Sequence, residues 1–165
     1  MDFERTEYLD RLTRLRGRMR ERGVDLLLLD EVEHLAWVAG WHATGSRYHA
    51  CLVPLDAEPV MVLRRLDEPV FRERSWLAEG VLVADTEDPV DAVVSVLGRR
   101  GWEAARIGVE LDSHYLTVRR YEALRGALPR ATFVDFAGAL PELRLRKSPA
   151  EVALLRRAAA IADQA

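Results

Sequence analysis

A short apolar run near the N-terminus constrains the fold more than any other part of the chain. Residues 24–30 read Val-Asp-Leu-Leu-Leu-Leu-Asp, with four successive leucines and no alternation of polar and apolar positions. A run of this length without alternation is typical of a strand that is buried on both faces. We therefore expect it to lie inside a sheet that is flanked by helices.

The segment before this strand has the pattern of an amphipathic helix. Within residues 5–22, Tyr8, Leu12, Leu15 and Met19 fall at helical spacing on one face. The arginines of this segment, Arg11 among them, are expected on its solvated surface. Gly23 is a suitable residue to end the helix.

Helical and strand-like patterns continue to alternate along the chain. The turn at 56–58 predicts a hairpin between two strands, and Pro89 predicts the first position of a helix that Asp88 opens. Asp30 is expected to cap a short helix after the first strand. Further strands are predicted at 50–54, 59–63, 81–84, 106–110 and 132–135, and further helices within 30–39, 67–78, 88–98 and 114–127. This alternation predicts an α/β domain of three layers, with a mixed sheet of about five to six strands.

Composition narrows the class of protein. The chain has 165 residues, of which 49% are hydrophobic and 31% charged, and its formal net charge is −3. These values are typical of one globular domain and do not favour nucleic acid as a partner. The longest apolar runs are far shorter than a membrane span, and the acidic N-terminus does not resemble a secretory signal. The lone Cys51 fits a reducing compartment, so we expect a cytoplasmic protein.

Candidate catalytic and metal-binding motifs do not converge. The four histidines lack the spacing of a zinc site and are expected at the surface or in loops. Cys51 falls in a predicted buried strand, where a thiol is usually inert. The segment from Gly40 to Gly45 is not followed by the Lys-Ser/Thr of a phosphate-binding loop. We therefore expect neither a catalytic set nor a metal site in this segment.

The segment from Trp37 to Tyr48 combines aromatic residues, glycines and one arginine. Such a loop can hold an arginine that binds an anion in a bidentate manner beside apolar walls. It can equally be a plain connection between a helix and a strand, with its aromatic residues packed on the core. The residues themselves leave both interpretations open.

The C-terminal part of the chain has a different pattern. Residues 141–147 predict an extended basic stretch, and Ser148-Pro149-Ala150-Glu151 is a capping box that starts a helix. That helix carries an apolar stripe and meets no stop signal before the last residue. The pattern suggests that a further segment follows; the alternative is a helix that docks on its own domain.

Three stretches together resemble the amino-terminal domain of the creatinase/prolidase/aminopeptidase P family of metalloenzymes. They are Gly23–Leu29, then His34–Trp41, which resembles the family's N-x-x-Y-L-T-G-F segment, and Leu143–Val152, which resembles its R-x-x-K-S-P-x-E-I linker. The resemblance covers essentially the whole chain. It implies a ribonuclease H-like α/β fold over residues 1–143. Residues 144–165 would then be the linker and first helix of a catalytic domain that the chain lacks.

The resemblance also implies a role. The catalytic domain would hold two divalent metal ions (Mn, Co or Zn), and this domain would help to shape the substrate cleft and a homodimer. The candidates for contact with a small peptide or amino-acid-derived substrate are Trp41, Arg47 and Tyr48. The main interpretation is the non-catalytic domain of a Xaa-Pro dipeptidase-like enzyme. The alternatives are the same domain of a creatinase- or ectoine-hydrolase-like enzyme, and a stand-alone binding or dimerisation module.

Overall fold

The computed structural model of the chain describes residues 2–42 and 47–164. Within these ranges the elements follow in the order α1 (Arg5–Glu21), β1 (Leu26–Leu29), α2 (Val32–Ala39), β2 (Ala50–Pro54), β3 (Val60–Arg64), the 3-10 turn η1 (Arg65–Asp67), α3 (Glu68–Arg74), β4 (Gly80–Val83), α4 (Pro89–Arg100), β5 (Arg106–Val109), α5 (Val118–Ala127), β6 (Thr132–Asp135), α6 (Ala139–Leu145) and α7 (Pro149–Ala162).

One mixed sheet of six strands forms the middle layer, in the order β4-β3-β2-β1-β5-β6. Strand β2 runs antiparallel to both of its neighbours, β1 and β3. The pairs β3–β4, β1–β5 and β5–β6 are parallel. The five other strands therefore share one direction, and their carboxyl ends meet at one edge of the sheet. The predicted α/β class, the mixed sheet and the β2–β3 hairpin are confirmed.

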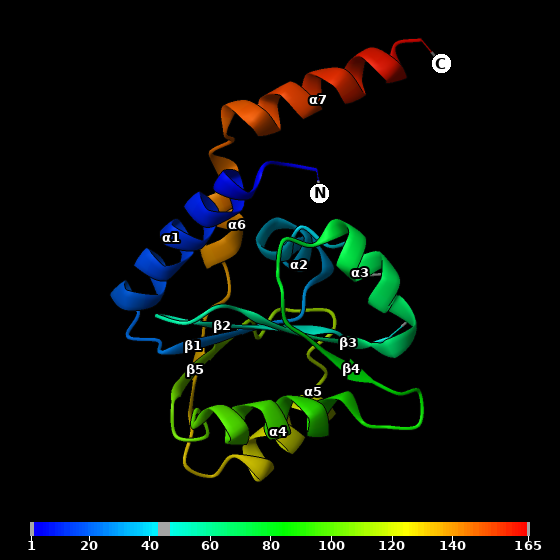
Figure 1. The fold of residues 1–165 in the computed structure, drawn as a ribbon. Helices are drawn as coiled ribbons and strands as arrows, with labels where there is room; N and C mark the ends of the chain where they lie inside the picture. The colour runs from blue at the N-terminus through cyan, green and yellow to red at the C-terminus, as the bar shows by residue number, and fades with distance from the viewer. Residues whose placement is uncertain (1, 43–46, 165) are drawn as a thin grey trace.

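Helices cover both faces of the sheet. Figure 1 shows α1, α2, α3 and α6 on one face and α4 and α5 on the other. The leucines of β1 alternate between the two cores: Leu27 and Leu29 pack under the first group of helices, and Leu26 and Leu28 under the second. The apolar run is continuous because each of its side chains meets a helix layer.

Some element boundaries differ from the sequence-based expectation. Residues 139–145, which include most of the predicted extended stretch, form α6, and its Ala139 and Leu140 are buried. Pro141 lies in the first turn of this helix, where proline costs no intrahelical hydrogen bond. The fifth helix begins at Val118, because the Thr117 side chain caps it there. The predicted domain boundary at 143/144 falls inside α6 and stays a prediction.

Several polar side chains lie deeper than expected. Arg11, predicted at the surface, is 1% exposed, and His34 and His49, predicted at the surface or in loops, are buried. Asp30 does not cap α2, since the N-cap position belongs to Glu31 and carries no side-chain cap bond. Each of these side chains has partners from distant segments, which local patterns cannot reveal. Among the described helices, none has the length and apolar character needed to cross a bilayer.

Candidate functional site

Polar side chains gather at the edge of the sheet where the parallel strands end. Asp30 follows β1, Arg64 ends β3, Asp85 follows β4 and Glu110 follows β5. The start of β2 lies at the same edge, because Cys51 pairs with Leu29 at the end of β1. Ligands of open α/β sheets bind at this edge. It is therefore the candidate functional site.

The loop that enters β2 is held at both ends by aromatic side chains. Trp41 is 1% exposed and packs edge-on against His49 and Phe71, with ring centroids 4.9 and 6.1 Å away. Tyr48 is buried in the opposite core, where the Arg120 guanidinium carbon lies 4.6 Å from its ring centroid. The two aromatic residues therefore lie on opposite faces of the sheet and do not form one contact surface.

Arg47 is the member of the predicted contact set that reaches solvent, with 42% of its side chain exposed. Its Nη2 donates to the backbone oxygen of Asp85 over 2.6 Å. Residues 43–46 of the predicted clamp lie outside the described part of the chain. Contact between Trp41, Arg47 or Tyr48 and a substrate stays a prediction, and the geometry favours Arg47 for it.

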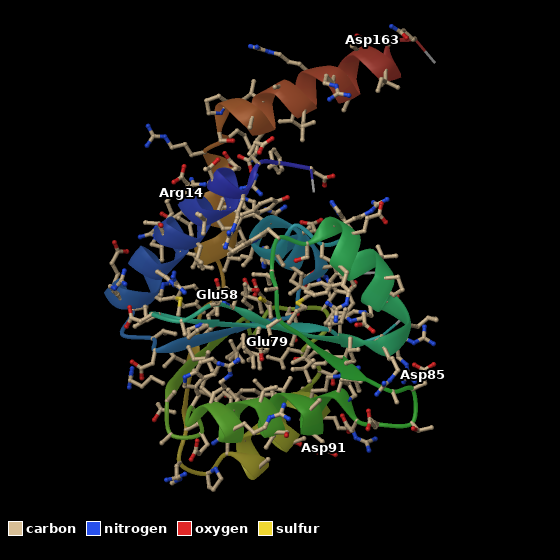
Figure 2. All side chains as sticks on the ribbon, in the orientation of Figure 1. Arg14, Glu58, Glu79, Asp85, Asp91 and Asp163 are labelled. Carbon is tan, nitrogen blue, oxygen red and sulfur yellow. The ribbon has the colours of Figure 1, made fainter. Side chains whose placement is uncertain are left out.

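Asp85 connects Arg47 to the end of β3. Arg64 binds the Asp85 carboxylate with two N–H groups, and this interaction lowers the pKa of Asp85. Figure 2 shows Asp85 just beyond the end of β4, at the rim of the sheet. Arg47, Asp85, Arg119 and Arg120 line a hollow of about 660 Å³ between the loop and the first turns of α4 and α5. The hollow is large enough for a small organic ligand.

A buried polar cluster lies at the same edge of the sheet. Ser113 Oγ donates to Asp30 Oδ1 over 2.6 Å, and the Tyr48 hydroxyl lies beside the same carboxylate. His34 Nδ1 lies 2.8 Å from Glu110 Oε2, and both side chains are buried. The cluster therefore connects the end of β1 and helix α2 to the loop that follows β5.

Ser113 in this cluster also stabilises the turn that follows it. Ser113 Oγ, besides donating to Asp30, accepts from the backbone N–H of Tyr115, so it serves a local turn. The acceptor of this hydroxyl is Asp30, and no histidine bonds it in the part of the chain that the structure describes. The described residues also contain no group of three or more His, Cys, Asp or Glu placed to hold a metal ion.

Burial sets the protonation of Asp30. Removal from water raises its pKa from 3.8 to about 6, and the nearby Glu110 and Glu31 charges act in the same direction. The hydrogen bond from Ser113 and the nearby Tyr48 hydroxyl oppose the shift. The folded protein therefore holds a proton at pH 5 that the unfolded chain has released.

Replacing Asp30 with asparagine is expected to flatten the pH dependence of stability. In the wild type, the free energy of unfolding falls as pH rises from 3.8 to about 6, by roughly 3 kcal/mol in total. The asparagine side chain keeps an acceptor for Ser113 but has no proton to lose. The stability of the variant relative to the wild type should therefore grow by most of that amount between pH 4 and pH 7, measured by urea unfolding. Asp112→Asn, at an exposed position, is the control. If the free energy of unfolding changed with pH in the same way in Asp30→Asn and in the wild type, the raised pKa of Asp30 would be contradicted.

Sequence reasoning missed this cluster, although a signal for it exists. Asp30 and Glu110 each follow directly on a buried strand, and parallel neighbours place such residues side by side. An acidic residue after each of two apolar strands could have indicated the site. The pairing of β1 with β5 was needed to make that signal specific.

The fold is a three-layer α/β domain with a mixed sheet, and polar side chains lie at the edge where its parallel strands end. Comparison with known proteins identifies the family of this domain. Residues 11–146 match the Creatinase/Prolidase N-terminal domain, so the chain belongs to this family.

Individual relatives extend the likeness. Ectoine hydrolase from Halomonas elongata is 30% identical and aligns with 94% of this chain and 42% of its own length. Creatinase from a Bacillus species is 29% identical over 98% of this chain and 39% of its own. The solved Xaa-Pro dipeptidase from Bacillus anthracis shares the fold, with a TM-score of 0.78 and 24% identity over 95% of this chain and 41% of its own. The chain thus spans about two fifths of the length of these relatives.

Proposed function

We propose that this chain is the amino-terminal domain of a hydrolase that cleaves a carbon–nitrogen bond in a small, amino-acid-derived substrate. In this proposal it forms part of the substrate cleft and of a homodimer, and a second domain performs the reaction. Membership of the family supports the proposal, as do relatives named ectoine hydrolase, creatinase and Xaa-Pro dipeptidase. By the family resemblance, the two divalent ions expected for catalysis would belong to that second domain.

The observation that carries the proposal is the position of Arg47. Its guanidinium is half exposed at the carboxyl edge of the sheet and lines the hollow there. Ectoine, creatine and Xaa-Pro dipeptides all bear a carboxylate, which is the group that a guanidinium binds with two parallel hydrogen bonds. We infer that Arg47 binds the substrate carboxylate.

Two substrate classes fit this role. The first is a Xaa-Pro dipeptide, as in the dipeptidases of the family. The second is a carboxylate that carries an amidine or guanidine, as in ectoine and creatine. The likeness to ectoine hydrolase, at 30% identity over 94% of this chain, favours the second class. Assays of the complete enzyme on all three compounds would separate the two classes.

A stand-alone binding module is the competing interpretation, and the gene tests it. A reading frame that continues past the codon for Ala165 into a metal-binding domain supports the proposal. A stop codon directly after Ala165 would overturn it in favour of a binding or dimerisation module.

Arg47→Ala in the complete enzyme is expected to raise KM by about 10- to 100-fold and to change kcat little. This range corresponds to roughly 1.5–3 kcal/mol for a hydrogen bond to a charged group that forms on substrate binding. Arg47→Lys should recover only part of the loss, because an ammonium group lacks the planar fork. Arg125→Ala, at an exposed position on α5, serves as the control. An unchanged KM for Arg47→Ala would remove this residue from the substrate site.

A further inference from the structure

Helix α7 leaves the domain in a direction that buried residues do not set. None of its residues between Pro149 and Ala162 is buried. Figure 1 shows α7 beyond α1 and α6, running away from the layered body toward the C-terminus. Apolar packing, which orients most helices in a domain, is therefore limited here, where Val152 and Leu154 are only half-buried. Polar contacts at its first turn are then the main source of its direction.

Arg11 lies at the centre of these contacts. Its side chain is almost fully buried on α1, and each of its nitrogens has a partner. Nε donates to Glu7 over 3.1 Å, Nη1 to the backbone oxygen of Trp37 over 3.1 Å, and Nη2 to Glu151 Oε1 over 3.0 Å. The guanidinium carbon also lies 4.2 Å from the ring centroid of Phe3. The planar guanidinium is thus held in one orientation and joins α1, α2 and α7.

Glu151 receives these contacts while it caps α7. Its Oε2 accepts the backbone N–H of Ser148 over 2.8 Å, which completes the capping box. Its Oε1 accepts from Arg11 and also from Trp37 Nε1, the latter over 3.2 Å. Capping alone needs only one of the two carboxylate oxygens. The other oxygen is bound by residues that are 140 and 114 positions away in the sequence.

We propose that Arg11 and Trp37 act through Glu151 as an orientation lock, which sets the angle between α7 and the domain. Because the lock holds the first turn of α7 by charge-assisted hydrogen bonds, the rest of the helix needs no buried contact with the domain. The three residues are positioning residues and need no substrate. If a second domain follows α7, as the proposed function holds, the same lock sets how that domain faces Arg47.

The angle of α7 can be measured directly in this chain. Spin labels at Glu58→Cys and Ala160→Cys, both exposed positions, report the distance between the domain and α7, and the buried Cys51 stays unlabelled. Ala160 lies about 14 Å along the helix from Glu151, so a swing of about 30° moves the label by roughly 7 Å. We expect one narrow distance distribution in the otherwise wild-type chain.

Loss of the lock is expected to broaden that distribution by several ångström. Arg11→Met removes the donors and keeps the apolar stem, and Glu151→Gln removes the charge and keeps a residue that completes a capping box. Arg14→Met is the matched control, since its guanidinium carbon lies 5.5 Å from the Trp37 ring, as that of Arg11 does, without a hydrogen bond to α7. Ser148→Ala weakens the cap and leaves the lock intact, so it should fray the helix without changing its angle.

The distance between the spin labels does not depend on enzymatic activity. Failure of the lock and failure of the proposed function are therefore distinguishable. Glu151→Gln lies outside the cores and keeps the test valid if Arg11→Met does not fold. Broadening in Glu151→Gln, with a narrow distribution in Arg14→Met, would establish the lock. An unchanged narrow distribution in Glu151→Gln, and in Arg11→Met where it folds, would overturn it.

Discussion

Replacing Trp41 with alanine is expected to lower the free energy of unfolding by about 3–5 kcal/mol, the range for a large aromatic side chain removed from a core. Trp41 is fully buried and packs edge-on against His49 and Phe71. Its loss would leave a cavity beside the sheet and release the start of the loop that carries Arg47. Urea unfolding followed by circular dichroism measures the change.

Trp41→Phe is the matched variant for this test. The phenyl ring keeps most of the aromatic contact, and Trp41 Nε1 has no hydrogen-bond partner among the described residues that phenylalanine would forfeit. We expect a cost of about 1–2 kcal/mol, from the smaller volume. A Trp41→Ala variant within about 1 kcal/mol of the wild type, inside the common range for surface changes, would contradict the anchoring role.

Gly40→Ala is expected to destabilise the domain by about 2–5 kcal/mol, for two reasons that add. Gly40 ends α2 with a φ of +68°, which is unfavourable for a side chain. A Cβ at this position would also lie 2.8 Å from the Cζ and Oη atoms of Tyr8. Tyr8 is fully buried and stacks on Trp76, so it has little room to move.

Gly101→Ala separates these two causes. Gly101 ends α4 with a φ of +71°, nearly the same as that of Gly40, and a Cβ there meets no atom within 4 Å. This variant should cost only the strain of the backbone conformation, about 1–2 kcal/mol. The difference between the two variants in thermal unfolding gives the cost of the contact with Tyr8. Equal losses would show that Tyr8 moves aside freely.

The elements that local pattern predicts well are those whose cause lies within a few residues. The four leucines of β1 indicated a strand buried on both faces, and the structure places two of them in each core. Ser148 and Glu151 indicated a capping box, and both of its hydrogen bonds are present. In each case, short-range sterics and hydrogen bonding decide the outcome.

The candidate site was harder to predict, because its residues meet through the sheet. Trp41 and Tyr48 belong to one short segment, yet they enter opposite cores. His34 and Glu110 are 76 positions apart and pair only because β1 lies beside β5. No local spacing encodes that neighbourhood.

The sequence by itself determined the class of fold, the family resemblance and nearly every strand, because hydrophobic period, caps and turn residues act over a few positions. The tertiary structure alone decided which polar residues are buried together. Arg11 shows the reason most clearly. The sequence pattern of α1 predicts that Arg11 is exposed to solvent. Arg11 is buried because the chain topology brings Glu151, 140 positions away, to the same point. A charge is stable inside a protein only where such partners meet it.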